Sequence, residues 1–551
     1  MSRWLFVAFG VWAFGVFPAS AAPIPANAPT ATPTVVLQAK SAGYFLEWGK
    51  TYARSGGEEA TKELQKLLEE RLGEKGFTGL DMLRPMAGYG VIKPKLEQSY
   101  GVLVLPVSTD KEFLDLLDRL KFEYAESKET PGLYDITAHG FGLHTIGGVE
   151  VPWRFRFHDK HIYLGVNAEK DDLAVKNLVP IRTLINPAEQ GIVAARVHLP
   201  GVDPVFVKLL TTKIDEWTTM VENDGNIGLR AFTKILVPLL KVLKRNVEAA
   251  AHDGETLQAN LLASGPVGEL GLELVLTGKP GTALTKEIAA RKPSTSRFAG
   301  LMPKDAVGGA VIQAPLFAPE LRAAGVEFLE EFGKDTLEQF KEQAPAELWP
   351  TFEEALKALV KGAKAGDLEA GFAMTGPDAN GHFTVVAALG GLDPVGVEKA
   401  FRAGIAKAPK LVQLAVKLDA AKAGKLDVHT VAAGPLLPPE VQKVVGEQAM
   451  AYVAFGTDAV YIVIGPNGPA ELTRAVGLKP GESNVLGFWV NPKRAAKLSD
   501  QLGEESNKAL LKMLPDEDRL VPLYSLEIQG GKELRVRFTN VLGRANFPTG
   551  P

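Results

Sequence analysis

The sequence predicts an α+β fold, built as a tandem pair of similar units, each a mostly antiparallel sheet with helices packed on one face. Most apolar strand patterns come in pairs separated by short polar turns, and helical patterns lie between the pairs, which favours antiparallel pairing. One such pattern occurs twice: residues 455–464 (FGTDAVYIVI) have nearly the same order of apolar and polar residues as residues 157–166 (FHDKHIYLGV). In both, a Phe-ended strand meets a polar turn and re-enters as an apolar strand around Tyr163 or Tyr461.

Residues 35–293 form the first predicted unit. The spacing of its leucines predicts a helix over 58–72, followed by strands over 88–92 and 101–107. A helix over 111–120 comes next, with Asp110 as its N-cap. Helices over 205–221 and 229–247 precede strands over 257–262 and 270–276, and Pro238 is expected to kink or split the second of these helices.

Residues 294–545 form the second predicted unit, which repeats this order. A helix over 353–360 is followed by strands over 368–374 and 383–389, and Asp393-Pro394 opens the next helix. A strand over 485–490 takes the place of 192–199, a helix near 492–513 follows, and strands over 523–528 and 533–538 close the unit. The segment 292–296 (KPSTS) predicts the boundary between the units, and 546–551 is a short tail.

Residues 1–21 have the pattern of a secretory signal peptide. Arg3 precedes an apolar run over 4–17, and Ala19-Ser20-Ala21 gives a small-residue cleavage pattern, with Ala22 as a second option. The run is shorter than the roughly 18 residues of a membrane span, and an uncleaved anchor is the alternative. Residues 22–34 then form a Pro/Thr linker. We expect a periplasmic or extracellular bacterial protein.

The amino-acid composition argues against some classes of function. Of the 551 residues, 46% are hydrophobic and 23% are charged, which is typical of globular proteins. The formal net charge of −4 argues against a global attraction to nucleic acid. The chain has no Cys, so packing rather than disulfides must stabilise it, and thiolate ligands and Cys nucleophiles are excluded.

No catalytic or cofactor-binding residue is predicted. Gly49-Lys50-Thr51 resembles the end of a phosphate-binding loop, but Tyr44 stands where that loop needs its first Gly. Ser108 and Lys111 have the Ser-x-x-Lys spacing without the partner motifs of penicillin-binding enzymes. We expect neither a nucleotide nor a nucleic acid as partner.

No metal site is predicted either. His158 and His161 flank a hairpin turn beside Asp159 and could converge on a metal ion, but Gly456 and Ala459 hold the corresponding places in the second unit. Exposed hairpin residues are the simpler interpretation. His139 and His144 would face opposite sides of a strand.

One basic helix face in the sequence suggests a membrane surface as a partner. It consists of five residues within 229–247, opposite an apolar face, namely Arg230, Lys234, Lys241, Lys244 and Arg245. Such a helix can lie on an anionic membrane. A core-facing helix with a solvated side is the commoner case.

The segment Gly79-Leu80-Asp81-Met82-Leu83-Arg84-Pro85-Met86-Ala87-Gly88, with 102–106 and 110–120 after it, resembles uncharacterised exported bacterial, planctomycete-like proteins. The resemblance implies repeated α+β units and supplies no activity. The prediction leans away from an enzyme, toward an exported, non-catalytic cell-envelope protein that is structural or binds a ligand or a partner, such as an envelope protein or a membrane surface. The alternative is a secreted hydrolase with dispersed carboxylates. A cleft with two close, pKa-perturbed acids would favour the hydrolase, and a broad exposed apolar patch or an apolar groove between the halves would favour binding.

Overall fold

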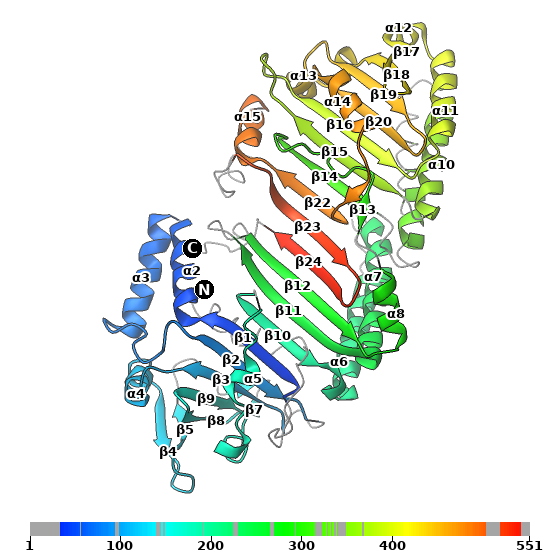
Figure 1. Ribbon diagram of the computed structural model, residues 1–551. Helices are drawn as coiled ribbons and strands as arrows, with labels where there is room; N and C mark the ends of the chain where they lie inside the picture. Colours follow the sequence, from blue (N-terminus) through cyan, green and yellow to red (C-terminus); the bar gives the residue numbers. More distant parts are fainter. Residues whose placement is uncertain are drawn as a thin grey trace.

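The fold was analysed in a computed structural model of the chain (Figure 1). The structure describes residues 33–55, 57–93, 98–138, 145–146, 149–189, 191–223, 230–264, 269–291, 294–313, 322–327, 329–331, 333–334, 338, 346, 349–365, 368–502 and 518–540.

Strands in the first half follow the predicted hairpins. They are β1 (Val35–Ser41), β2 (Pro85–Val91), β3 (Tyr100–Pro106), β4 (Glu123–Glu126), β5 (Leu133–Ala138), β6 (Thr145–Ile146), β7 (Val149–Glu150), β8 (Trp153–His158), β9 (His161–Val166), β10 (Val193–His198), β11 (Gly254–Ser264) and β12 (Glu269–Gly278). The predicted strands over 88–92, 101–107, 257–262 and 270–276 are confirmed within a few residues.

Helices in the first half connect these strands. They are α2 (Ala42–Ser55), α3 (Glu58–Leu72), α4 (Asp110–Arg119), α5 (Ile181–Leu184), α6 (Pro204–Glu222), α7 (Arg230–Asp253) and α8 (Ala283–Ala290), with one-turn helices η2 (Val175–Asn177) and η3 (Leu199–Gly201).

The N-cap predicted for α4 was wrong, and of the two outcomes predicted for Pro238, a kink or a split, the split was wrong. Thr109, not Asp110, is the N-cap of α4, and its hydroxyl accepts a bond from the Glu112 amide. Asp110 is already the first helical residue, where its charge favours the helix dipole. Pro238 does not split α7, which runs through it as one helix. Packing outweighs the single lost backbone bond.

Strands in the second half are β13 (Thr295–Ser296), β14 (Gly308–Gln313), β15 (Glu369–Thr375), β16 (Thr384–Gly390), β17 (Val416–Ala423), β18 (Leu426–Ala432), β19 (Met450–Phe455), β20 (Ala459–Ile464), β21 (Gly481–Glu482), β22 (Leu486–Val490), β23 (Val521–Gln529) and β24 (Leu534–Asn540). The predicted hairpin of Tyr461 is confirmed as β19–β20, and that of Tyr163 as β8–β9.

Helices in the second half are α10 (Trp349–Ala365), α11 (Pro394–Lys407), α12 (Lys410–Ala415), α13 (Pro439–Val445), α14 (Gly468–Val476) and α15 (Pro492–Leu502), with the one-turn helix η6 (Gly434–Leu436). Asp393 caps α11 as predicted, because its carboxylate accepts from the Gly396 amide. Beyond residue 502, the helix predicted over 492–513 lies outside the described residues.

One sheet runs through both halves. Among the described residues, its 20 strands lie in the order β4-β5-β8-β9-β3-β2-β1-β10-β11-β12-β24-β23-β22-β14-β15-β16-β20-β19-β18-β17, and every pairing is antiparallel. The prediction of an antiparallel sheet is confirmed. The prediction of a separate sheet in each unit was wrong, because β12 pairs with β24 from Leu270↔Asn540 to Leu276↔Leu534.

Helices pack on both faces of this sheet, so the expectation of one covered face was also wrong. We call the face that carries Tyr89, Tyr163 and Tyr461 the tyrosine face, and the face that carries Leu105, Leu272 and Leu389 the leucine face. The reason is visible in β3, where Val102 and Val104 are apolar on one side and Leu103 and Leu105 on the other. Strands that are apolar on both sides need cover on both sides.

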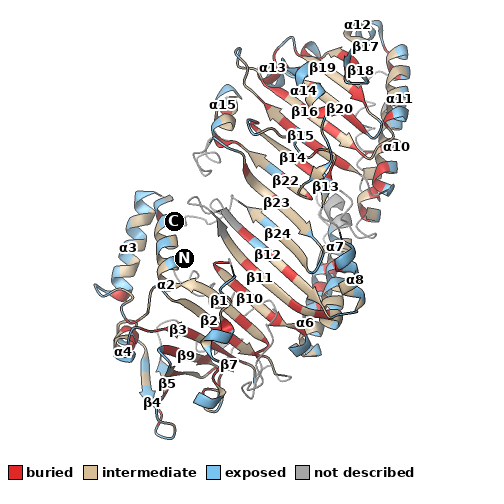
Figure 2. Cartoon of the chain, in the orientation of Figure 1, coloured by how far each residue is buried: buried red, intermediate tan, exposed pale blue. Residues whose placement is uncertain are grey.

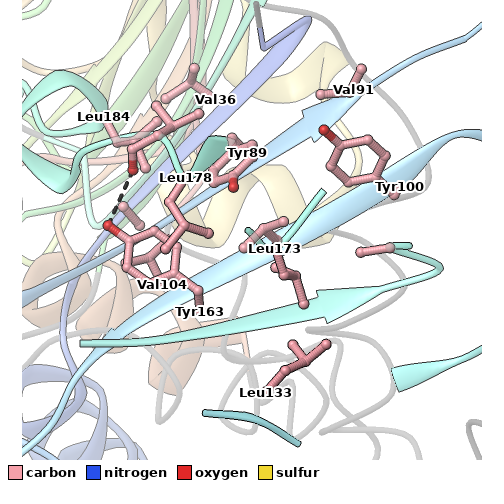
Figure 3. Close-up of a cluster of buried hydrophobic side chains, with 14 residues drawn as sticks. Val36, Tyr89, Val91, Tyr100, Val104, Leu133, Tyr163, Leu173, Leu178 and Leu184 are labelled. Atoms are coloured by element: carbon pink, nitrogen blue, oxygen red, sulfur yellow. Dashed lines mark hydrogen bonds between the residues drawn. The ribbon is translucent and has the colours of Figure 1, made fainter. Parts of the chain in front are cut away.

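The tyrosine face is covered in the first half by residues 168–185, which include α5. In Figure 3, Tyr89, Tyr163 and Val104 meet Leu173, Leu178 and Leu184 in this core. The Tyr163 hydroxyl donates to the carbonyl of Val179 at 3.2 Å, and burial raises the pKa of Tyr163 to about 12. In the second half, α14 and residues 298–302 cover the same face.

On the leucine face, Val197, Leu257 and Leu276 of β10, β11 and β12 pack with Leu199 of η3. The other packed cores that the structure describes on this face lie toward the two ends of the sheet. Helices α3 and α4 pack there on β3, β8 and β9. Helices α13 and α15 pack there on β15, β16 and β20. Figure 2 shows the central strands β22, β23 and β24 mostly in tan, whereas β15 and β16 alternate with red.

Candidate interaction surface

Apolar side chains form a continuous row across the leucine face at the centre of the sheet. In the first half the row runs through the Cα partners Val193↔Leu261 and Leu261↔Leu272, and it crosses to the second half at Leu272↔Phe538. Paired residues of an antiparallel sheet point to the same side. The row therefore passes over the junction of the two halves without a break.

The row continues to β16 through partners in the second half: Leu526, Leu486, Ile312, Ala370 and Leu389. A second row lies beside it, in which Ala310 pairs with both Phe372 and Phe488. We call these two rows together the apolar band.

The band is unusually open to solvent for its chemistry. Its most exposed members are Leu272 (37%), Phe488 (38%), Phe372 (39%), Phe538 (39%) and Ile312 (42%). Isolated exposed apolar residues are ordinary, whereas a contiguous patch of them marks an interaction surface. A broad exposed apolar patch is the feature expected under the binding hypothesis rather than the hydrolase hypothesis.

The reverse pattern holds on the tyrosine face of the same strands, where polar residues are buried. Asn260, Glu273 and Gln313 are only 3%, 4% and 1% exposed. Glu273 Oε1 accepts from Arg537 Nη2 at 2.7 Å and from Arg535 Nη1 at 3.3 Å. Arginine side chains thus shield this face and satisfy its buried charge.

Glu369 is a buried acid on the tyrosine face of β15. Its Oε2 accepts from the backbone amide of Arg297 at 3.1 Å. Burial raises the pKa of Glu369, and the nearby Arg297 amide and charge oppose that rise only in part. The neighbouring carboxylate, Asp458, is held in an ion pair with Arg297 Nε at 3.1 Å.

A cluster of possible metal ligands joins α11 to the edge hairpin β17–β18. Ligand atoms of Glu398, Asp419 and His429 lie within 4.8 Å of one another. Arg402 already occupies the space between the carboxylates: its Nε donates to Glu398 at 2.8 Å and its Nη1 to Asp419 at 2.9 Å. These bonds lower the pKa of Asp419.

The tautomer of His429 also argues against a metal ion in this cluster. His429 is fully buried, and its Nδ1 accepts from the Asp419 amide at 3.1 Å. In the neutral ring the proton then resides on Nε2, the nitrogen that faces Glu398 at 3.4 Å. The lone pair that a metal would need is on Nδ1, which lies 3.6 Å from an Asp419 carboxylate oxygen but already accepts the Asp419 amide. Sequence spacing gave no sign of this cluster, because a β-bulge between Lys417 and Ala421 brings Asp419 to it.

Of the histidines singled out in the sequence, the structure describes His158 and His161, and these two form no such cluster. His158 and His161 are paired across the β8–β9 turn, as predicted. His161 is 5% exposed and its Nδ1 bonds the Asp159 carbonyl at 2.6 Å, whereas His158 is exposed. Burial lowers the pKa of His161. His139 and His144 lie outside the described residues.

The other residues weighed for chemistry have structural roles. Lys50 lies within helix α2 and pairs with Glu47 at 2.7 Å. Ser108 Oγ donates to the Leu80 carbonyl at 3.2 Å. Asp81 accepts from the Leu83 amide and from Arg84 Nε, which closes the turn before β2.

The basic face of α7 is partly neutralised by α6. Lys241 pairs with Glu222 at 3.1 Å and Lys244 with Asp215 at 2.7 Å. Helix α6 instead exposes apolar residues, with Trp217 at 49% and Met220 at 63%. No helix in the described part of the chain is both long and apolar enough to cross a bilayer.

Comparisons with known proteins identify no family. No protein-family model matches the sequence, and no curated protein matches it. The chain has a distant structural likeness to the protein TP0453 in its crystal form IV, with a TM-score of 0.23 and 12% identity over 52% of this chain and 90% of that one. A score this low does not establish a common fold.

Proposed function

We propose that the chain is an exported, non-catalytic binding protein of the bacterial cell envelope, and that the apolar band is its binding surface. The band itself is the observation that supports this proposal. Its side chains are exposed although they are apolar, while Asn260, Glu273 and Gln313 on the opposite side are buried although they are polar. Leaving so much apolar surface in water is unfavourable, and a bound partner removes that cost.

We also propose that the sheet is built from a tandem pair of similar units. Strand pairings support this. In the first half, β9 lies between β3 and β8. In the second half, β20 lies between β16 and β19, so β20 corresponds to β9, β16 to β3 and β19 to β8. β1 lies between β2 and β10 just as β14 lies between β15 and β22. Tyr163 and Tyr461 then lie in matching strands.

The junction of the proposed units has an approximate two-fold arrangement. A Glu-Leu pair marks the start of both strands, Glu269-Leu270 for β12 and Glu533-Leu534 for β24, and it aligns the two sequences. Counting from there, Glu273 and Arg537 hold matching positions, and they are also each other's Cα partners. Opposite charges at equivalent positions favour pairing of unlike units over pairing of like units.

The remaining parts of the proposal rest on the sequence. They are the signal peptide over 1–21, the linker over 22–34, the units over 35–293 and 294–545, and the tail over 546–551. The resemblance to exported planctomycete-like proteins agrees with an exported location. The hydrolase alternative needs a second free carboxylate near Glu369, and Asp458 is instead paired with Arg297.

A photo-reactive amino acid placed at Ile312 tests the binding role. In cells that express the full chain, we expect irradiation to link position 312 to an envelope component, because Ile312 is the most exposed side chain of the band. The matched control is position 411, since Leu411 on α12 is 79% exposed but far from the band along the sheet. Absence of an adduct at 312, or identical adducts at both positions, would contradict the proposal.

A further inference from the structure

We propose that the apolar band holds the hydrocarbon chains of single amphiphilic lipid molecules. The inference rests on the proposed binding function and specifies its ligand. Three properties of the band point to this occupant: its lack of polar groups, its width and its surroundings.

The band offers almost nothing to a hydrogen-bonding partner. The paired residues from Val193 to Leu389 are Val, Leu, Ile, Phe and Ala, and none is charged. The central strands are paired on both sides, so their backbone groups are already used within the sheet. An extended peptide laid on this face would leave its own amides and carbonyls unpaired, which is unfavourable. Hydrocarbon has no such groups to satisfy.

The width of the band suits lipid chains. From β10 to β16 the main row crosses nine neighbouring strands in the order given above. At about 4.8 Å between strands, the row is about 38 Å wide. One leaflet of a bilayer contributes about half of the 30 Å hydrocarbon core. Extended chains of that length fit within the band with room to spare.

The surroundings of the band disfavour a broad, flat partner. Helices α3 and α4 pack on the leucine face toward one end of the sheet, and α13 and α15 pack on it toward the other. A planar bilayer, or the same face of a second copy, would meet these helices before it reached Leu272 and Phe538. Separate, flexible chains can lie between them.

Equilibrium binding of a dansyl-labelled fatty acid to the mature full-length protein tests the proposal. Ile312→Glu and Phe372→Glu each place a charge in the band, and we expect each to weaken probe binding about tenfold or more, because a desolvated charge must then lie against hydrocarbon. Leu411→Glu on α12 and Met220→Glu on α6 are matched controls, expected to bind like the parent protein. Circular dichroism and thermal melting confirm that each variant is folded.

The outcomes separate the possible occupants. Parental affinity in both band variants, or loss only in Met220→Glu, would overturn the proposal. Binding to sedimented phospholipid vesicles without binding of monomeric probe would show a membrane-surface protein instead. A dimer that Ile312→Glu dissociates in light scattering would identify a second copy as the occupant. If the probe fails to bind but position 312 still cross-links to an envelope protein, the binding function stands and the lipid assignment falls.

Discussion

Glu273 lies at the junction of the two halves and has little access to water. Burial alone would raise its pKa, but hydrogen bonds from Arg537 and Asn260 and the charges of Arg535 and Arg537 outweigh burial and lower the pKa of Glu273. A carboxyl whose pKa is lowered by folding stabilises the protein above its unfolded pKa of about 4.3. That contribution is lost as the pH falls through the lowered value.

Glu273→Gln should therefore destabilise the protein at pH 7, by about 1–3 kcal/mol, because the change removes the charge that Arg535 and Arg537 compensate. The difference from the parent should shrink below pH 4, where the parent carboxyl also becomes protonated. Denaturant unfolding at both pH values measures this. Glu533→Gln is the control, since Glu533 pairs with Arg535 at the surface, where ion pairs contribute little. An equal loss at both pH values would contradict the assignment.

Helix α11 and strand β17 are joined by Arg402, which bonds Glu398 on its own helix and Asp419 in the bulge of the strand. β17 is an edge strand with mostly exposed residues. Arg402 thus adds a contact from α11 to the pairing of β17 with β18. The neighbouring ring of Phe401 lies 5.6 Å from the buried His429 ring.

Arg402→Leu should loosen β17, because Glu398 and Asp419 then face each other without a cation. We expect amide exchange in β17 and in the paired part of β18 to accelerate by about tenfold, which corresponds to about 1.4 kcal/mol. Exchange in the β4–β5 hairpin at the opposite edge is the internal control. Unchanged exchange in β17 would show that pairing with β18 suffices to hold it.

Elements with local signals were predictable from the sequence, and those set by tertiary contacts were not. The leucines of α3 and the Asp-Pro start of α11 fixed those helices correctly. The alternation of Leu270, Leu272, Leu274 and Leu276 was readable as one apolar side of a strand, but alternation does not say which side remains in water. The apolar band comes from strands far apart in the chain, so no window of sequence contains it. The Glu398–Arg402–Asp419 contacts span only 21 positions, but they depend on the irregular backbone of β17, which has no signal in the sequence.

Across the whole molecule, the predicted antiparallel arrangement is correct and the predicted division into two sheets is not. Composition and periodicity describe each strand but not its neighbours, and the β12–β24 pairing joins residues more than 250 positions apart in sequence. The export of the molecule stays a prediction, because residues 1–32 lie outside those that the structure describes.

Export can be checked on the mature protein. We expect the chain recovered from the periplasm or medium to begin at Ala22 or Pro23, because the small residues Ala19 and Ala21 suit signal peptidase. Intact mass measurement and N-terminal sequencing give the answer. A variant with Ala19→Arg, Ala21→Arg and Ala22→Arg, which changes both cleavage options, should accumulate at full length in the membrane. Recovery of the unprocessed parent chain from the membrane would favour the anchor alternative.

Because the 20 described strands form one main sheet rather than two, that sheet has two edge strands instead of four. One is the short β4, and the other is β17 with its bulge and its lysines. Short length, bulges and lysine are features that hinder a further strand from joining. Fusing the sheets at β12 and β24 thus removes two sites at which crowded copies of this protein would stick together and grow into fibres. Protection against such assembly then depends on β4 and β17, at opposite ends of the sheet.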